Sequence, residues 1–155
     1  MRNEINFFGL LHFQKNENLK LNFKSKSDKE KILVYLKNAI VLSEQLNKFG
    51  YKFELITNDK KYINTLLKKL NFSLNLRQIS FKTFVPPNTH FYSCHYRVDV
   101  FKYLSFLKNS YSILIDLDVL ILNKPTNLIK NSNQEIAFVN KITSNVLPAY
   151  GKKNI

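Results

Sequence analysis

Residues 113–125 read ILIDLDVLILNKP, and two carboxylates interrupt an otherwise aliphatic run. Apart from Asp116 and Asp118, every residue from Ile113 to Leu122 is a branched aliphatic. Side chains in a β-strand alternate between the two faces, so a strand here would point both carboxylates to the same side. Like charges at that spacing repel, and burying them without partners adds to the cost. The pair is therefore expected either at a strand end in water or around a bound cation.

Apolar runs rich in β-branched and aromatic residues alternate with helical patterns before and after this stretch. The runs predict strands at residues 5–13, 52–57, 76–81, 111–116 and 135–140. Helices are predicted from the capping box of Ser27 and Glu30 to Gly50, from Asn58 or Asp59 to about Leu70, and from Asn88 or Thr89 to about Lys108. Strands separated by helices indicate βαβ units. The predicted fold class is α/β, a three-layer Rossmann-like sandwich with a mainly parallel sheet, in one domain over residues 1–155.

The position of the predicted strand at 111–116 matters because ligands of open α/β sheets bind at the carboxyl ends of the strands. Asp116 lies at such an end, and the order of the predicted elements makes this strand a central one. The aspartate pair therefore becomes the candidate site. A strand at the edge of the sheet would remove this argument.

The charge of the chain limits its partners. Its 155 residues contain 24 lysines and arginines against 11 acidic residues, which gives a net charge of +13. Such a chain either attracts anionic partners, such as nucleotides and phospholipid head groups, or carries a solvated lysine-rich surface. One cysteine allows no disulfide framework, and no run approaches the roughly 18 apolar residues of a membrane span. These features predict a cytoplasmic protein, with an anionic membrane as a candidate peripheral partner.

Residues 95–125, HYRVDVFKYLSFLKNSYSILIDLDVLILNKP, combine a helical pattern, an aliphatic strand, an Asp-x-Asp pair and a following Lys-Pro. This block resembles the DxD segment of the GT-A glycosyltransferases. It is most similar to the glycogenin-like and galactosyltransferase-like enzymes and to sugar transferases with a "DxxR…YlDxD" pattern. Residues 4–81 resemble these proteins in topology only. The resemblance implies a GT-A fold, an Mn²⁺ or Mg²⁺ ion, a UDP- or GDP-sugar donor, and a saccharide or lipid-linked acceptor.

The resemblance also assigns roles to individual residues. Asp116 and Asp118 match the DxD pair, which holds the metal against the donor diphosphate, and Asp116 is also matched to a donor ribose contact. Arg97 matches a helix arginine that reaches the donor sugar or phosphates. Asp99 and Lys102 match the two ends of "DxxR", with lysine in place of arginine. That replacement loses the bidentate fork of a guanidinium.

The metal assignment has a chemical reason that does not depend on the family. The leaving group of a nucleotide-sugar is a diphosphate, and a divalent cation can stabilise its developing charge as a Lewis acid. Hard cations prefer carboxylate oxygens and commonly keep water and substrate phosphates as their remaining ligands. Two carboxylates at one strand end are enough for such an open site.

Each candidate residue also has a purely structural interpretation. Backbone N–H groups or lysines could satisfy the aspartate pair, and Arg97 could form an ion pair with one of the aspartates from a helix stripe shared with Phe101 and Leu104. Asp99 and Lys102 could form a surface pair, since they lie three residues apart on a helix. The three histidines, His12, His90 and His95, show no metal-ligand spacing and are expected to be capping or surface residues. Cys94 is expected to be a small buried hydrophobic residue. Asp59 is expected to be a helix cap.

Three other functions compete with the glycosyltransferase interpretation. A haloacid-dehalogenase-like phosphatase also uses Asp-x-Asp, but it normally has a hydroxyl residue where this chain has Leu120, and Glu135 is the only later acid. A basic nucleic-acid-binding module would need a recognition signature, and none is present. The third possibility is a truncated remnant, because no aspartate or histidine follows Asp118 to complete an acceptor half. On that interpretation the chain binds a donor weakly and turns it over slowly or not at all.

Overall fold

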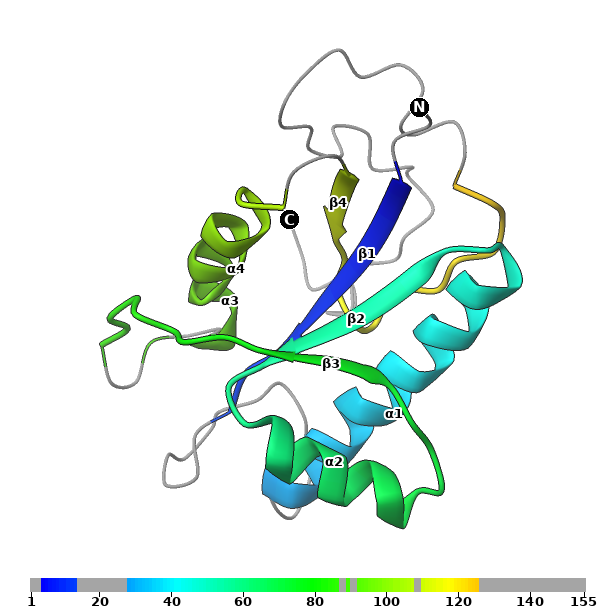
Figure 1. Ribbon diagram of the computed structural model, residues 1–155. Helices are drawn as coiled ribbons and strands as arrows, with labels where there is room; N and C mark the ends of the chain where they lie inside the picture. Colours follow the sequence, from blue (N-terminus) through cyan, green and yellow to red (C-terminus); the bar gives the residue numbers. More distant parts are fainter. Residues whose placement is uncertain (1–3, 14–27, 87–88, 90–91, 108–109, 126–155) are drawn as a thin grey trace, which may run out of the picture. The chain divides into compact units, whose positions relative to one another are not determined.

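A four-stranded parallel sheet forms the centre of the described part of the chain (Figure 1). The computed structural model describes residues 4–13, 28–86, 89, 92–107 and 110–125. The strands are β1 (Glu4–Leu11), β2 (Lys52–Thr57), β3 (Asn75–Gln78) and β4 (Ser110–Leu114), in the order β3-β2-β1-β4. All of them belong to a compact unit of residues Met1–Asn123, and residues Lys124–Ile155 form a second unit. The predicted α/β class with a parallel sheet is confirmed.

Four helices connect these strands within the same residues. They are α1 (Asp28–Lys48), α2 (Lys60–Lys69), α3 (Tyr92–His95) and α4 (Arg97–Leu104). None of the helices in the described segments is long and apolar enough to cross a membrane. The prediction of one long helix up to about Lys108 was wrong, because the chain makes a turn at Tyr96 between α3 and α4. The ring of Tyr96 is buried and stacks on His12, a contact that helical periodicity cannot show.

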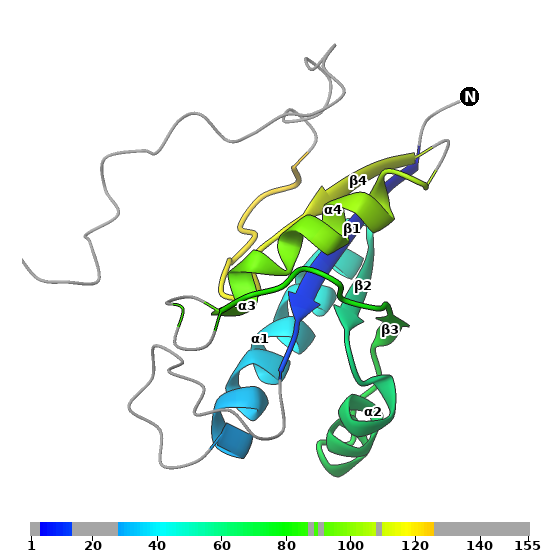
Figure 2. The same ribbon diagram turned by 90° about the vertical axis from the view of Figure 1, so that its left-hand side faces the viewer.

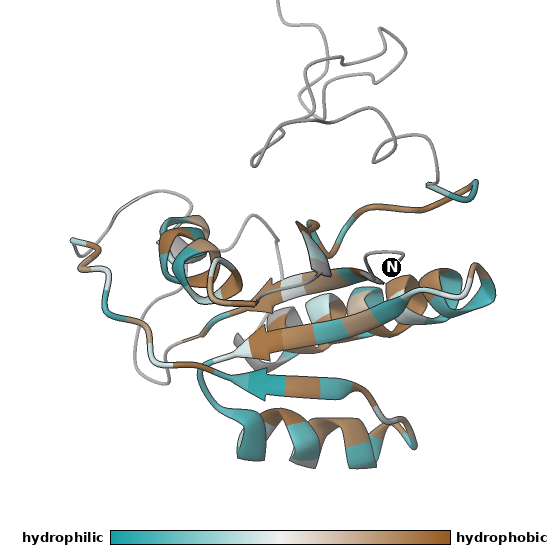
Figure 3. Cartoon of the chain, turned by 45° about the horizontal axis from the view of Figure 1, so that its top comes forward, coloured by the Kyte–Doolittle hydropathy of each residue, from teal (hydrophilic) through white to brown (hydrophobic). Residues whose placement is uncertain are grey.

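Side chains along β1 alternate between the two faces of the sheet, and each face is covered by helices. The sheet is therefore the middle of three layers (Figure 2). Phe7 and Leu11 pack with the buried residues of α1 and α2. Phe8 points to the other face and packs with Val100 and Leu104 of α4. In Figure 3 the hydrophobic stretches of the strands are coloured brown.

The helix ends follow the local signals in the sequence. Gly50, two residues after the end of α1, has a φ of +79°, the left-handed conformation that favours glycine at a helix end. Asp59 caps α2, since its carboxylate accepts a hydrogen bond from the Tyr62 backbone N–H at 2.9 Å. Both predictions are confirmed. Ser27 and the predicted strand at 135–140 lie outside the described residues.

Strand β4 occupies one edge of the sheet in the part of the chain that is described. It pairs with β1 alone, from Glu4 opposite Ser110 to Phe8 opposite Leu114, and the Ile115 N–H continues the pairing to the Phe8 carbonyl at 2.9 Å. The prediction of a central strand was therefore wrong for these residues, because β1 is the one strand among them that pairs with β4. A site at this strand must be supported by something other than a central position.

Candidate functional site

The order of the strands reverses between β1 and β4. From β1 the chain builds outward through β2 to β3, and then crosses back to place β4 on the opposite side of β1. In doubly wound sheets the crevice at such a reversal, outside the carboxyl ends of the strands, is where ligands bind. Here the segments that follow these two ends are His12–Phe13 and Ile115–Asp118.

Asp116 and Asp118 lie in a turn directly after β4 and are both exposed. The strand ends at Leu114, and the Val119 N–H approaches the Asp116 carbonyl at 3.4 Å across the turn. The predicted strand to residue 116 was too long, so strand alternation does not determine where the two carboxylates point. The two carboxylates are exposed after the end of the strand, a position that is compatible with both of the arrangements that the sequence allowed.

Leu117, between the two carboxylates, anchors this turn in the core. Its side chain is buried in the cluster formed with α1 and the sheet. Gly9 of β1 leaves room for it, since a Cβ atom at Gly9 would lie 2.5 Å from Leu117 Cδ2 and 2.9 Å from Phe53 Cζ. The aliphatic surroundings of the aspartates therefore hold the turn against β1 while the carboxylates remain in solvent.

Arg97 forms an ion pair with Asp116, through a guanidinium nitrogen and the Asp116 Oδ1 atom. The first residue of α4 thus meets the turn after β4, as one of the two sequence interpretations expected. Both side chains are partly exposed, so the pair contributes at most about 1 kcal/mol to folding. The expected stripe with Phe101 was wrong, because α4 buries Val100 and Leu104 and leaves Phe101 exposed.

Asp99 fastens the segment after β3 to α4. Its Oδ2 atom accepts a hydrogen bond from the Thr83 backbone N–H at 3.0 Å. Burial acts to raise the pKa of Asp99, but hydrogen bonds from Thr83 and Lys82 and the charge of Lys102 bring the pKa below its ordinary value. Asp99 thus accepts hydrogen bonds from the backbone of Thr83 and Lys82 and from the Thr83 side chain, and Lys102 is an exposed neighbour. A donor-binding role for Asp99 and Lys102 stays a prediction.

His12 is buried at the end of β1, where the sequence suggested only a capping or surface residue. That prediction was wrong because two rings from distant segments cover the imidazole: Tyr96 stacks on it at 3.7 Å between ring centroids, and Phe81 meets it edge-on at 4.8 Å. Burial lowers the pKa of His12 to about 4, although the Asp99 carboxylate acts to raise it. The imidazole is therefore neutral at pH 7. In the sequence, the indication of this burial was the place of His12 inside the apolar run at residues 5–13.

This lowered pKa predicts acid sensitivity. Between pH 6.5 and about 4 the unfolded chain binds a proton at His12 that the folded chain does not, so the stability is complete above pH 6.5 and is lost as the pH falls to about 4. We expect the wild type to lose about 2 kcal/mol more than a His12→Phe variant between pH 7 and 4.5, as measured by urea unfolding. Equal losses in the two proteins would contradict a buried neutral imidazole.

Tyr35 of α1 is a further neighbour of the turn that the sequence did not reveal. Burial raises the pKa of its phenol, and the charges of Asp118, Cys94 and Asp116 add to this effect. A tyrosine within an amphipathic helix gives no sign of such a neighbourhood. Cys94 itself is exposed, so its expected burial was wrong.

Asn58 holds the chain at the end of β1. Its Oδ1 atom accepts a hydrogen bond from the Phe13 N–H at 3.2 Å, and its Nδ2 atom donates one to the Phe13 carbonyl at 2.6 Å. Asp59 takes the capping role, which leaves the Asn58 amide free for this bridge. The segments after β1 and β2 are thereby tied to each other.

Asp116 and Asp118 supply carboxylate oxygens, the ligands that a hard cation prefers. No group of three or more His, Cys, Asp or Glu side chains that could enclose a metal occurs among the residues described. A cation at Asp116 and Asp118 would then take its remaining ligands from water and from phosphate oxygens. The donor set is chemically suitable for Mg²⁺ or Mn²⁺, with Arg97 supplying a further positive charge.

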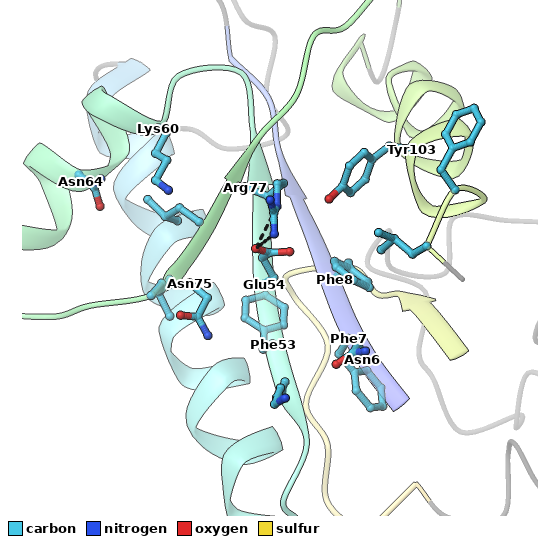
Figure 4. Close-up of a pocket in the computed structure, with 15 residues that line it drawn as sticks. Asn6, Phe7, Phe8, Phe53, Glu54, Lys60, Asn64, Asn75, Arg77 and Tyr103 are labelled. Atoms are coloured by element: carbon cyan, nitrogen blue, oxygen red, sulfur yellow. Dashed lines mark hydrogen bonds and ion pairs between the residues drawn. The ribbon is translucent and has the colours of Figure 1, made fainter. Parts of the chain in front are cut away.

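An open hollow of about 710 Å³ lies elsewhere on the sheet, and none of the aspartates of the turn lines it (Figure 4). Its wall includes Phe8, Glu54, Arg77 and Tyr103, with Arg77 and Glu54 in an ion pair at 3.1 Å. The residues of β1 and β2 in this wall, 6–8 and 52–54, come from the amino-terminal parts of those strands. Ligands of parallel sheets bind at the opposite ends, so the hollow is not the candidate site.

Comparison with known proteins adds no family assignment to this geometry. The chain matches no protein-family model, no curated protein and no solved structure. The functional interpretation therefore depends on the block at residues 95–125 and on the place of its aspartates in the fold.

Proposed function

We propose that this chain binds the donor of a GT-A glycosyltransferase, a UDP- or GDP-sugar held through a divalent cation. The observation that carries the proposal is the place of the Asp116–Asp118 turn, at the carboxyl end of β4 where the strand order reverses beside β1. On this proposal the sugar is transferred to a saccharide or lipid-linked acceptor.

The strand order supports the proposal independently of the motif. The order β3-β2-β1-β4 corresponds to the first four strands of a doubly wound nucleotide-binding sheet. An Asp-x-Asp pair is common by chance, but a chance pair has no reason to follow the strand next to the reversal. Because β4 lies at an edge of the sheet in the described residues, the reversal of the strand order supports the site in place of a central strand.

Each residue of the turn has a defined task on this proposal. Asp116 and Asp118 would hold Mn²⁺ or Mg²⁺, which would stabilise the charge on the departing diphosphate. Arg97 orients the Asp116 carboxylate and places a second positive charge beside the phosphates. Leu117 keeps both carboxylates beside the carboxyl end of β1 by its burial against Gly9.

Calorimetric titration of the full chain with UDP and with GDP, each with and without Mn²⁺, tests the proposal. We expect binding of a nucleoside diphosphate only when the metal is present. A chain that ignores both nucleotides and instead binds nucleic acid in a salt-dependent, metal-independent way would overturn the proposal in favour of a basic binding module.

Arg97→Gln is expected to weaken nucleoside diphosphate binding about tenfold, because a charge-assisted contact to phosphate is lost. The free energy of unfolding should change by less than about 1 kcal/mol, since the ion pair with Asp116 is partly exposed. Arg77→Gln is the matched control, because Arg77 also pairs with a carboxylate but lines the separate hollow. Equal effects of the two variants on nucleotide binding would contradict the role of Arg97.

A further inference from the structure

The outward face of α4 carries large apolar side chains where a surface helix normally carries polar ones. The exposed fractions are 63% for Val98, 49% for Phe101 and 71% for Phe106, two residues beyond the end of the helix. Val98 and Phe101 are three residues apart and so share one face, while Val100 and Leu104 fill the core on the other. Apolar side chains therefore lie on both sides of the helix. Those on the inner side are buried in the core, whereas those on the outer side are exposed.

The segment after β3 adds to this surface. Phe84 is 83% exposed, and its neighbour Thr83 is bonded to Asp99 of α4. Lys82 and Lys102 are exposed in the same two segments. The outer side of α4 and residues 82–84 thus combine protruding apolar rings with lysines.

The net charge of +13 decides between the partners that could cover such a surface. Two copies of this chain repel each other, so self-association is disfavoured, whereas an anionic surface is attracted. Nucleic acid offers phosphates to lysines but no apolar medium for protruding aliphatic side chains such as Val98. A bilayer with anionic lipids offers both, because apolar side chains enter the head-group boundary while lysines remain at the phosphates.

We propose that the outer face of α4, formed by Val98, Phe101 and Lys102, docks on an anionic lipid bilayer together with the exposed Phe106 beyond the helix, which also borders the hollow beside β1 and β2. This inference stands without the nucleotide-sugar proposal, since it uses none of the carboxylates of the turn. If both hold, α4 links the two surfaces, because its first residue, Arg97, contacts Asp116.

A tryptophan reporter tests the docked face directly, since the chain contains no tryptophan of its own. We expect the fluorescence of Phe106→Trp to shift to the blue with vesicles of phosphatidylcholine and phosphatidylglycerol at low salt, and not with phosphatidylcholine alone. Phe72→Trp is the control, because Phe72 is an exposed aromatic residue in the turn between α2 and β3. Its emission should stay unchanged with both kinds of vesicle.

Vesicle sedimentation measures the contribution of each side chain. The double variant Phe101→Ser, Phe106→Ser should lower partition into the mixed vesicles at least roughly tenfold, because two apolar rings lose their burial. Lys102→Gln should lower it about five-fold. Val41→Ser removes an exposed apolar side chain from α1 and should have no effect. All four side chains are exposed, so the variants should keep the wild-type unfolding temperature.

Three results would overturn the inference. These are equal binding to neutral and anionic vesicles, binding to anionic vesicles that the double variant does not reduce, and a dimer in sedimentation velocity that the double variant abolishes. The second result would assign the binding to dispersed lysines, and the third would assign the face to a second copy of the chain.

Discussion

Asp118→Asn is expected to abolish Mn²⁺-dependent binding of UDP or GDP, a loss of at least roughly a hundredfold, while the metal-free chain stays as stable as the wild type. The loss is expected because a neutral amide oxygen is a poorer ligand for a hard cation than a carboxylate. The unchanged stability is expected because Asp118 is exposed and the described ion pair of the turn belongs to Asp116. Removing an exposed charge near another aspartate changes the free energy of unfolding by about 0.5 kcal/mol or less.

Thermal unfolding of both proteins, with and without Mn²⁺ plus UDP or GDP, measures the two effects together. The wild type should gain stability with metal and nucleotide, whereas the variant should not. Glu44→Gln removes an exposed carboxylate from α1 and should behave like the wild type. A destabilised metal-free Asp118→Asn protein, together with a wild type that is indifferent to metal and nucleotide, would show that Asp118 is a structural residue.

Leu117→Ala is expected to lower the free energy of unfolding by about 2–4 kcal/mol, because it leaves a cavity where the turn is anchored. Gly9→Ala should cost about 1–3 kcal/mol for the opposite reason, since its Cβ would collide with the Leu117 and Phe53 side chains. In the double variant the added Cβ occupies space that Leu117 has vacated. Its loss should therefore be smaller than the sum of the two single losses.

Urea unfolding of the four proteins completes this double-mutant cycle. Strict additivity would mean that Leu117 does not pack against Gly9, and the account of the anchored turn would then fail. Leu66→Ala is a control from the same core, because Leu66 is buried in α2 and should combine with Gly9→Ala additively.

Features that depend on neighbours in the chain were predictable from the sequence. Strand β2 begins and ends at the predicted residues 52 and 57, because its apolar run is bounded by a glycine turn and by the cap of the next helix. Gly50 and Asp59 act as predicted, since a left-handed turn and a side-chain cap are decided within a few residues. The aspartate pair could likewise be singled out as a candidate site, because charge inside an aliphatic run needs a reason.

Features that depend on distant segments were not predictable. The single helix predicted up to about Lys108 divides at Tyr96, and the buried Tyr96 ring stacks on His12, which Phe81 also covers. The length of β4 was overestimated because aliphatic residues continue beyond the point where its pairing with β1 ends. Neither a pattern nor a propensity contains such information.

The sequence by itself thus determined the positions of the described strands along the chain, the helix end at Gly50, the helix cap at Asp59 and the identity of the two carboxylates. The tertiary structure decided which side chains meet them: Arg97 at Asp116, Leu117 over Gly9, and the Asn58 amide on the Phe13 backbone. The physical reason is the range of the interactions. The periodicities of helices and strands and the capping of helices depend on residues that are close in the sequence. The contacts named above form only after the sheet has aligned the ends of β1, β2 and β4.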